Sequence, residues 1–307
     1  MNLPHGFIPV MLTPFHEDGA VDFETLTRLT EFYLDAGAAG LFATCLSSEM
    51  YELTPDERLA VTEHVVRTAA GRVPVVATGT FGGTISEQAD FVKKTADMGV
   101  QAVIVISSLL AEADEPDEVW MENAHDLLRQ TEGVPLGFYE CPVPYKRLLS
   151  PESLGGLAAT GRVVYHKDTS LDLDQVKAKL AAAQGHTFGL YDAYMVHAVD
   201  SLRAGASGLS CIQGNFFPEL VDWLCRHFDD PAQAEAVEAV QAFFTKNMDL
   251  MHSAYPTIAK YALRQRGFPI SEKTRRNVGP LTGDLRGRVD ALLIEYEVNF
   301  NHRVHGV

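Results

Sequence analysis

The chain has 307 residues, of which 46% are hydrophobic, and it carries a formal net charge of −16. This negative charge repels nucleic acid and anionic membrane surfaces, and no stretch reaches the ~20 apolar residues that a membrane-spanning helix needs. Composition therefore argues against a nucleic-acid-binding or membrane protein. It favours a soluble protein that acts on a small molecule.

The amino terminus lacks the basic segment, apolar run and small-residue cleavage site of a signal peptide, so we expect a cytoplasmic protein. Four scattered cysteines, Cys45, Cys141, Cys211 and Cys225, form no CxxC pair, and reduced thiols are expected. The first three end predicted strands at one mouth of the fold. Because their spacing matches no ligand pattern, we predict no metal site.

Short apolar runs alternate with segments of helical period along the chain. The predicted strands cover residues 7–12, 40–45, 74–79, 102–107, 135–140, 163–168, 187–192 and 208–212. Segments between them carry apolar residues at three- and four-residue spacing, as in residues 23–36, 55–70, 86–98 and 117–130. Strand followed by helix, eight times over, predicts an α/β fold, a (β/α)8 TIM barrel, in residues 1–230.

Capping residues mark the predicted helix ends. Candidate starts are Asp22, Thr54 with Pro55 and Glu57, Ser86, and Ser150 with Pro151, and candidate ends are Gly37, Gly71, Gly99 and Gly205. Residues 231–307 exceed what a barrel needs and contain helical patterns at 232–251, 257–266 and 285–299. We assign them to a C-terminal helical extension packed on the barrel.

Lys167 is the first candidate for chemistry, because barrels of this kind carry their active residues at the carboxyl ends of strands. Of nine lysines, only Lys167 ends an apolar strand. Alternation places it with Val163 and Tyr165 on the face that fills the barrel. Desolvation lowers the pKa of a buried lysine, which yields a neutral amine that can attack a carbonyl. Position alone leaves another interpretation open, a lysine that reaches solvent or pairs with Asp168 or Glu140.

Tyr139 ends the preceding strand and shares a face with Gly137, which we expect to leave room beside it. Neighbouring strands lie about 4.8 Å apart, so the phenol and the amine can meet over one substrate. Tyr139 would then transfer protons, although a tyrosine at a strand end is also a common amphipathic plug. By the same alternation His166 faces the helices and is assigned a structural role.

Ser47 and Ser48 follow the second predicted strand. Their hydroxyl groups and the neighbouring backbone N–H groups are suited to holding a carboxylate. A serine pair before a helix is also an ordinary cap, so the pattern alone does not decide between the two.

Several segments together resemble the dihydrodipicolinate synthase / N-acetylneuraminate lyase family of class I aldolases. They are residues 8–15 (IPVMLTPF), Glu49 with 53–58 (LTPDER), Tyr139-x-x-Pro142, Lys167-Asp168 and residues 205–215 (GASGLSCIQGN). The resemblance implies that Lys167 forms an imine with pyruvate or a larger 2-oxo acid. It further implies that Tyr139 shuttles the proton of the 4-hydroxyl and that Ser47 and its neighbours bind the carboxylate. A homo-oligomer, tetramer or dimer, without metal or organic cofactor, is also implied.

This chain departs from the family pattern at several positions. Leu46 stands where the family has a proton-relay threonine, Leu110 lies in the segment where the synthases have a tyrosine, and Pro144 replaces an arginine. Dihydrodipicolinate synthesis is therefore not expected. Tyr194 lies where sialate lyases carry acidic residues, which argues against sialic acid as a substrate.

The second half of the site is assigned by hypothesis to Tyr194, Tyr145, Lys146, Arg147 and Ser210, whose basic pair favours an acidic or hydroxylated partner. The favoured function is a lyase that cleaves or forms a carbon–carbon bond between a 2-oxo acid and an aldehyde. Two alternatives stay open. One is a dehydratase of 2-keto-3-deoxy sugar acids that uses the same lysine, and the other is a 2-oxo-acid-binding protein without turnover.

Overall fold

Eight parallel strands form one sheet at the centre of the molecule. The structure is a computed structural model and describes residues 4–301. The strands are β1 Gly6–Phe7, β2 Leu41–Phe42, β3 Val75–Thr78, β4 Ala102–Ile106, β5 Leu136–Tyr139, β6 Val163–Asp168, β7 Gly189–Asp192 and β8 Gly208–Leu209. They pair in the order β1-β8-β7-β6-β5-β4-β3-β2, and a parallel bridge between Val10 and Phe42 links the segment after β1 to β2.

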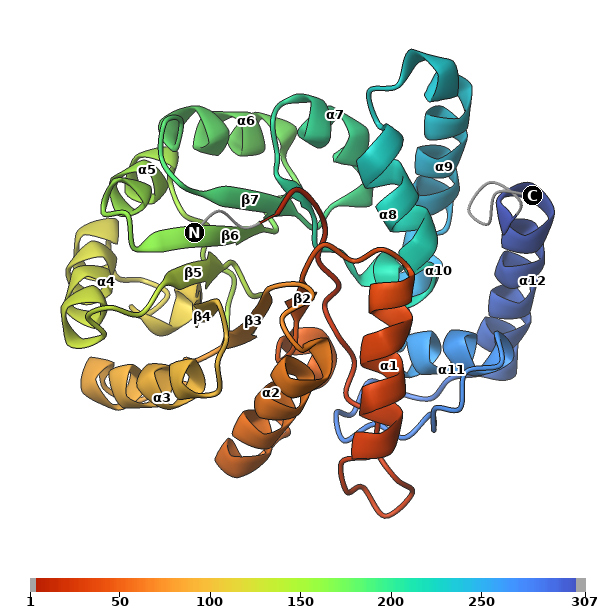
Figure 1. Ribbon diagram of the computed structural model, residues 1–307, viewed down its shortest axis with the longest axis horizontal. Helices are drawn as coiled ribbons and strands as arrows, with labels where there is room; N and C mark the ends of the chain where they lie inside the picture. Colours follow the sequence, from red (N-terminus) through yellow and green to blue (C-terminus); the bar gives the residue numbers. More distant parts are fainter. Residues whose placement is uncertain (1–3, 302–307) are drawn as a thin grey trace.

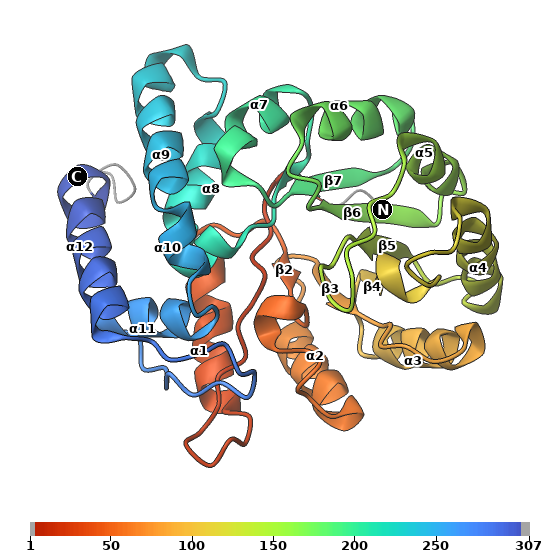
Figure 2. The same cartoon turned by 180° about the vertical axis from the view of Figure 1, so that it is seen from behind.

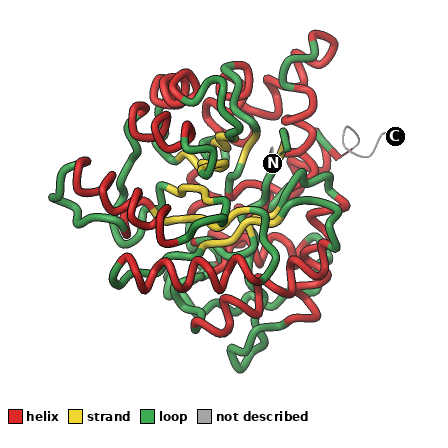
Figure 3. The backbone as a smooth tube through the Cα atoms, turned by 60° about the vertical axis from the view of Figure 1, so that its left-hand side comes forward, coloured by secondary structure: helices red, strands yellow, loops and turns green. Residues whose placement is uncertain are grey.

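Helices surround this sheet (Figure 1). They are α1 Phe23–Asp35, α2 Pro55–Ala69, α3 Ile85–Asp97, α4 Asp117–Gln130, α5 Pro151–Ala159, α6 Leu173–Ala182, α7 Ala198–Arg203, α8 Pro218–His227, α9 Ala234–Lys246, α10 Met248–His252, α11 Thr257–Gln265 and α12 Gly283–Asn299. Figure 3 shows the strands inside and the helices outside. The predicted α/β alternation is confirmed, although several strands are shorter than predicted and the single helix predicted at 232–251 is two helices, α9 and α10.

Most helix ends follow the capping residues read from the sequence. Asp22 accepts a hydrogen bond from the Thr25 backbone, and Thr54 with Glu57 forms a capping box. The prediction that Ser86 begins a helix is wrong, because Thr84 and Glu87 form a capping box two residues earlier. The four glycines predicted to end helices all have positive φ angles.

Strand β6 contains an irregularity that moves one predicted residue. Leu136 pairs with Val163, but the next residue, Gly137, pairs with Tyr165, so β6 has one extra residue at this point. Val163 consequently packs in the cluster that faces the helices, and its predicted place inside the barrel is wrong. Tyr165 belongs to the hydrophobic cluster on the inner face of the sheet, as predicted.

The space beside Gly137 is filled. A Cβ atom at this glycine would lie 2.7 Å from both Tyr165 Cβ and Ile104 Cδ1. The expectation that Gly137 leaves room beside Tyr139 is therefore wrong, since this glycine instead lets the Tyr165 ring pack inside the sheet.

Aromatic rings fill the inner face of the sheet. Tyr165 stacks on Tyr191 with ring centroids 4.9 Å apart, and Phe42 contacts Tyr165 and Tyr139 edge-on at 6.1 and 6.0 Å. All four rings are buried, so they form an apolar floor at the carboxyl ends of β5 and β6.

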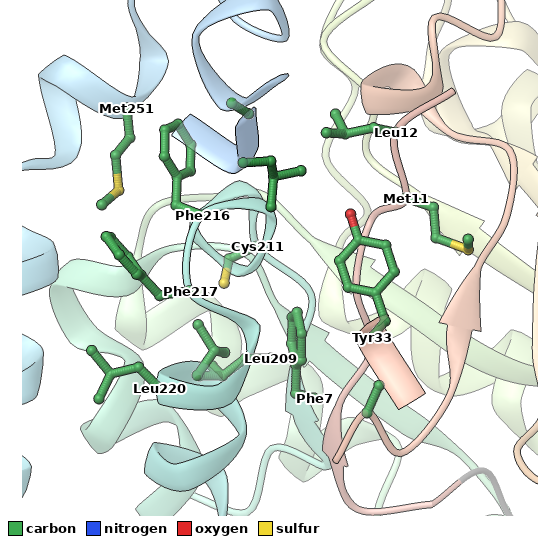
Figure 4. Packing of buried hydrophobic residues seen from close by; sticks show 14 of the residues in the cluster. Phe7, Met11, Leu12, Tyr33, Leu209, Cys211, Phe216, Phe217, Leu220 and Met251 are labelled. Carbon is green, nitrogen blue, oxygen red and sulfur yellow. The ribbon is translucent and has the colours of Figure 1, made fainter. Parts of the chain in front are cut away.

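Helices α9 to α12 lie beside α1 and α8 (Figures 1 and 2). Phe243 of α9, Met251 of α10 and Leu292 of α12 share one hydrophobic cluster with Tyr33 of α1 and Leu220 of α8. Figure 4 shows part of this packing, in which Met251 and Leu220 lie near Phe216 and Phe217. None of the helices within residues 4–301 is long and apolar enough to span a bilayer.

Candidate active site

A cavity of about 470 Å³ opens at the carboxyl ends of the strands. Its barrel side is lined by Leu46, Ser47, Tyr139, Pro142, Lys146, Lys167, Thr169, Leu171, Ala193, Tyr194 and Ile212. Its other wall comes from the segments after α9, through Met248, Asp249, His252, Tyr255 and Arg276. The cavity therefore lies between the strand ends and the C-terminal helices.

Lys167 is buried at the base of this cavity without an anionic partner. Its side chain is 4% exposed, and no carboxylate within residues 4–301 lies at ion-pair distance from its ammonium. Desolvation lowers its pKa from the ordinary value of 10.5. The thiols of Cys45, Cys141 and Cys211 oppose this lowering, but burial raises the pKa of the Cys141 thiol and raises that of Cys211 to about 12, so these two thiols stay protonated near neutral pH. The site thus favours the neutral amine at Lys167.

Tyr139 is the direct neighbour of Lys167 across the sheet. The two residues are paired in the β5–β6 register, and Lys167 Nζ lies 4.2 Å from the centroid of the Tyr139 ring. Burial, together with the thiols of Cys141 and Cys45, raises the pKa of Tyr139 well above its ordinary value. The phenol is therefore a neutral proton donor beside an amine.

Glu140 and Asp168, the sequence-based candidates for pairing with Lys167, pair with another lysine. Lys179 of α6 donates to Glu140 Oε1 at 2.5 Å and to Asp168 Oδ2 at 2.6 Å, and all three side chains are fully buried. His166 lies in the same cluster, with Nε2 3.5 Å from Glu140 Oε1. Its predicted position toward the helices is confirmed.

Charge balance sets the protonation of these four residues, Glu140, His166, Asp168 and Lys179, which we call the outer cluster. Burial alone would raise the pKa values of Glu140 and Asp168, but His166 and Lys179 hold both below their ordinary values. Burial likewise opposes the charge of Lys179, and the two carboxylates raise its pKa. Glu140, His166 and Asp168 are close enough to ligate a metal ion, but the Lys179 ammonium already contacts both carboxylates.

The three predicted serines have different surroundings. Ser47 lines the cavity. Ser48 lies beside the cavity lining, and its hydroxyl contacts the backbone oxygens of Met11 and Ala43 at 2.7 and 2.9 Å. Ser210 donates to the Ile8 backbone oxygen at 2.9 Å and is likewise absent from the cavity wall. Only Ser47 is placed to meet a ligand.

The residues predicted for the second half of the site also fall into two groups, those that line the cavity and those that do not. Tyr194 and Lys146 line the cavity, whereas Tyr145 donates its hydroxyl proton to the Ala111 backbone oxygen at 2.5 Å. Arg147 binds the backbone oxygens of two residues in the β4–α4 loop and the carboxylate of Asp117 at 2.8 Å. The structure thus assigns Tyr145 and Arg147 to holding a loop, in place of the substrate contact that we predicted.

Tyr194 is fixed by its neighbours. Its backbone N–H donates to Asp192 Oδ1 at 2.9 Å, and its ring contacts the His197 ring edge-on at 5.0 Å. His197 Nε2 lies 2.9 Å from Asp192 Oδ2. Burial lowers the pKa of His197, but the contact with Asp192 outweighs burial and raises it. A half-buried phenol is therefore held at the cavity wall after β7.

Sequence reasoning missed the contribution of the C-terminal segments. Arg276 is placed in the cavity by Glu49, a buried carboxylate just after η1 (Leu46–Ser48), whose Oε2 accepts from the backbone N–H groups of Arg275 and Arg276 at 2.6 and 2.8 Å. Glu49 Oε1 accepts from Lys260 Nζ at 2.9 Å. This anchor joins residues more than two hundred positions apart in the chain.

Lys260 offered a signal that could have indicated this anchor. It lies in an otherwise apolar run, TIAKYAL, in residues 257–263. A lysine on the buried side of a helix needs a buried carboxylate, and Glu49 belongs to one of the matched family motifs. The pairing partner itself does not follow from the sequence pattern.

A second hollow, of about 560 Å³, lies between the end of α1 and α8. Four of its five charged residues pair with one another, Arg226 with Asp222 at 2.7 Å and Arg266 with Glu219, and the fifth is Asp35. No lysine or cysteine lines it. We therefore place the chemistry in the cavity at the strand ends.

A sequence model of the Dihydrodipicolinate synthetase family matches residues 3–295. The chain belongs to this family. It is 27% identical over 295 residues to a 4-hydroxy-tetrahydrodipicolinate synthase of Shewanella baltica (strain OS155), with 95% of this chain and 96% of that protein covered. A synthase of the same name from Shewanella piezotolerans is 25% identical over 286 residues, covering 92% and 95%.

Solved structures with the same fold include other members of the family. A monomeric dihydrodipicolinate synthase variant has a TM-score of 0.87 at 20% identity and covers 96% of this chain and 98% of its own. A prophage protein of the dihydrodipicolinic acid synthase family from E. coli K12, solved in complex with pyruvate, has a TM-score of 0.85 at 21% identity and covers 95% and 98%. Family membership makes this chain a pyruvate-dependent lyase of the class I aldolase type.

Proposed function

We propose that this protein forms a Schiff base between Lys167 and pyruvate or a larger 2-oxo acid, and cleaves or forms a carbon–carbon bond with an aldehyde. The observation that carries the proposal is the isolation of Lys167. It is the cavity lysine that is buried, its pKa is lowered, and the nearby carboxylates are neutralised by Lys179.

The proposed reaction follows from these surroundings. The neutral amine of Lys167 attacks the C2 ketone, the former ketone oxygen takes up a proton from solvent and leaves as water, and the resulting iminium draws electrons from the C3–C4 bond as it breaks. Tyr139, beside the amine, receives the proton of the 4-hydroxyl as the aldehyde forms and passes on its own phenol proton, so that it stays neutral. Ser47 lines the same cavity, and we assign its hydroxyl to the substrate carboxylate.

Borohydride reduction in the presence of pyruvate tests the imine. We expect one reduced pyruvate adduct per chain, which peptide mapping assigns to Lys167. The Lys167→Arg variant should give no adduct. The matched control is Lys146→Arg, which changes the exposed lysine of the same cavity and should leave the adduct at Lys167 intact. A wild-type protein without an adduct at Lys167 would remove the proposal.

For the second half-site we propose an acidic or hydroxylated partner, bound by Lys146 and Arg276 in place of the predicted Lys146–Arg147 pair. Both cations line the cavity, and Tyr194 in the same lining supplies a hydroxyl group. Removing a hydrogen bond to a charged group costs about 1.5–3 kcal/mol, so Arg276→Ala should raise KM for an acidic aldehyde about 10- to 100-fold.

The control for this test is Arg288→Ala, which removes an exposed arginine of α12 outside the cavity lining. A panel that pairs each acidic aldehyde with a neutral analogue separates charge recognition from loss of folding. Equal KM values for both members of each pair in wild-type protein would contradict the assignment. Product analysis decides between the aldolase and a sugar-acid dehydratase, since the aldolase releases pyruvate and the dehydratase a dehydrated 2-oxo acid.

We also propose that the reaction differs from dihydrodipicolinate synthesis. Leu46 presents an apolar side chain to the cavity, Leu110 is buried in the hydrophobic cluster that faces the helices, and Arg147 is bound to the β4–α4 loop. A turnover assay with pyruvate and the aldehyde used by the synthases tests this. Turnover as fast as that of a Shewanella synthase assayed in parallel would contradict it.

We propose a homo-oligomer, tetramer or dimer, as the family resemblance implies. Sedimentation equilibrium should give a multiple of the 33.7 kDa chain mass. A single species at the chain mass over the working concentration range would contradict this part of the proposal.

A further inference from the structure

Tyr139 needs a second group if it is to transfer protons. Its phenol is buried and its pKa is raised well above the ordinary value, so a free phenolate is costly. Every proton that it accepts must therefore be matched by one that it gives away. The neighbouring Leu46 has no hydroxyl to receive that proton.

Tyr255 offers a second phenol in the same cavity. It lies between α10 and α11 and reaches the cavity wall from the C-terminal side. The amide nitrogen of Asn215, in η4 (Ile212–Asn215), donates to Tyr255 Oη at 2.6 Å. This contact holds the Tyr255 hydroxyl in one place.

Asn215 also fixes the direction of the hydrogen bond. The same amide nitrogen donates to the Val10 backbone oxygen at 2.9 Å, and a carbonyl oxygen can only accept. The amide oxygen accepts from the hydroxyl of Tyr33, which is packed in the core on α1 (Figure 4). The Tyr255 oxygen is thus an acceptor toward Asn215, and its own proton is directed elsewhere.

Ser47 lines the same cavity as Tyr255, and its hydroxyl can exchange protons with the phenol. Burial raises the pKa of Tyr255, with hydrogen bonding from Ser47 and Asn215 opposing it, so the phenol keeps its proton at neutral pH. Tyr139 and Tyr255 line the same cavity, and the charge that Tyr255 can carry is one of the causes that raise the pKa of Tyr139.

We propose that Tyr255 is a second catalytic phenol, which passes protons between Tyr139 and Ser47. The inference rests on the proposed Schiff base. When the C3–H bond of the pyruvate iminium breaks, its electrons form the C2=C3 bond and the C=N electrons move to nitrogen. The proton goes to Tyr139, the Tyr139 proton to Tyr255, the Tyr255 proton to Ser47, and the Ser47 proton to water in the open cavity. One proton leaves the iminium, one reaches water, and neither phenol becomes charged.

Exchange of the pyruvate methyl protons in D2O, followed by NMR, tests this step without an aldehyde. Tyr255→Phe should slow the exchange about 100-fold, the order of a general acid–base contribution. The extent of borohydride trapping at Lys167 should stay at the wild-type level, since the imine still forms. The matched control is Tyr261→Phe. It removes a hydroxyl group of α11 that donates a hydrogen bond to Asp290 outside the cavity.

Each outcome separates this inference from the proposed function. Trapping with slow exchange supports the relay, whereas trapping with exchange within about two-fold of wild type overturns it and leaves the Schiff base standing. A wild-type protein without trapping overturns both. If Tyr255→Phe fails to fold, 3-fluorotyrosine at position 255 keeps the ring and hydroxyl. It should move the pH profile of exchange to lower pH, and an unchanged profile would overturn the relay.

Discussion

Strands β5 and β6 present two buried environments, one on each face, and each holds a lysine. On the inner face Lys167 has the Tyr139 ring and neutral thiols around it, and its pKa is lowered. On the outer face Lys179 touches two carboxylates, and its pKa is raised. Both side chains are nearly or fully buried, so burial alone does not decide reactivity. The difference comes from where Glu140 and Asp168 point.

Strand alternation produces this separation. Lys167 points inward, whereas His166 and Asp168 on either side of it contact the outer cluster. Because Lys179 satisfies the carboxylates outside, none of the negative charge is available to Lys167. The outer cluster therefore holds the strand ends in place and also keeps the inner lysine without a partner.

Removing the outer lysine should give the largest change in stability. Lys179→Met leaves the buried Glu140 and Asp168 with His166 as the remaining basic side chain of the cluster, and breaking such a pair costs about 3–5 kcal/mol. The free energy of unfolding from urea denaturation measures this, with Lys177→Met as control, because Lys177 is exposed on the same helix. A loss of less than about 1 kcal/mol would mean that the cluster does not stabilise the strand ends.

The sign of the pH dependence follows from the raised pKa of Lys179. Its stabilising contribution is complete below the ordinary lysine value of 10.5 and is lost as the pH rises through its folded value. The deficit of Lys179→Met should therefore be constant near neutral pH and shrink in strong alkali. A deficit that grows with alkaline pH would contradict the assigned charge.

Replacing the inner lysine, Lys167, should change the free energy of unfolding in the opposite direction and by a smaller amount. Lys167→Met replaces an unpaired buried amine by an apolar chain of similar length, so we expect a gain of about 0.5–2 kcal/mol together with loss of the pyruvate adduct. Since the pKa of Lys167 is lowered, its cost is complete below the folded value and is relieved as the pH rises toward 10.5. The gain should thus shrink as the pH rises.

Urea denaturation at several pH values measures this gain, with Lys146→Met as the exposed control from the same cavity. A destabilised Lys167→Met protein would show that Lys167 has a structural partner and would remove the contrast between the two faces.

Much of the inner face could be predicted from sequence, because strand alternation and capping are local. Lys167, Tyr165 and His166 lie where alternation puts them, and the register of β5 and β6 brings Tyr139 beside Lys167. The predicted position of Val163 is wrong because one extra residue in β6 shifts the alternation of side chains, and nothing in the sequence marks that irregularity.

The rest of the site depends on contacts between distant segments. Arg276 and Tyr255 enter the cavity only because Glu49, Lys260 and Asn215 hold the C-terminal segments against the strand ends. Such pairings have no period in the sequence. For the same reason Lys146 of the predicted basic pair lines the cavity and Arg147 does not, since side-chain direction in a loop is set by its partners.

The central claim is that Lys167 supplies a neutral amine while Lys179 stays charged. NMR titration of lysines labelled with ¹³C at Cε tests it directly, with the two signals assigned from the Lys167→Arg and Lys179→Arg proteins. We predict that the Lys167 signal titrates below the ordinary value of 10.5 and that Lys179 keeps its proton beyond it. A Lys167 midpoint at or above 10.5, or loss of the Lys179 proton first, would contradict the account.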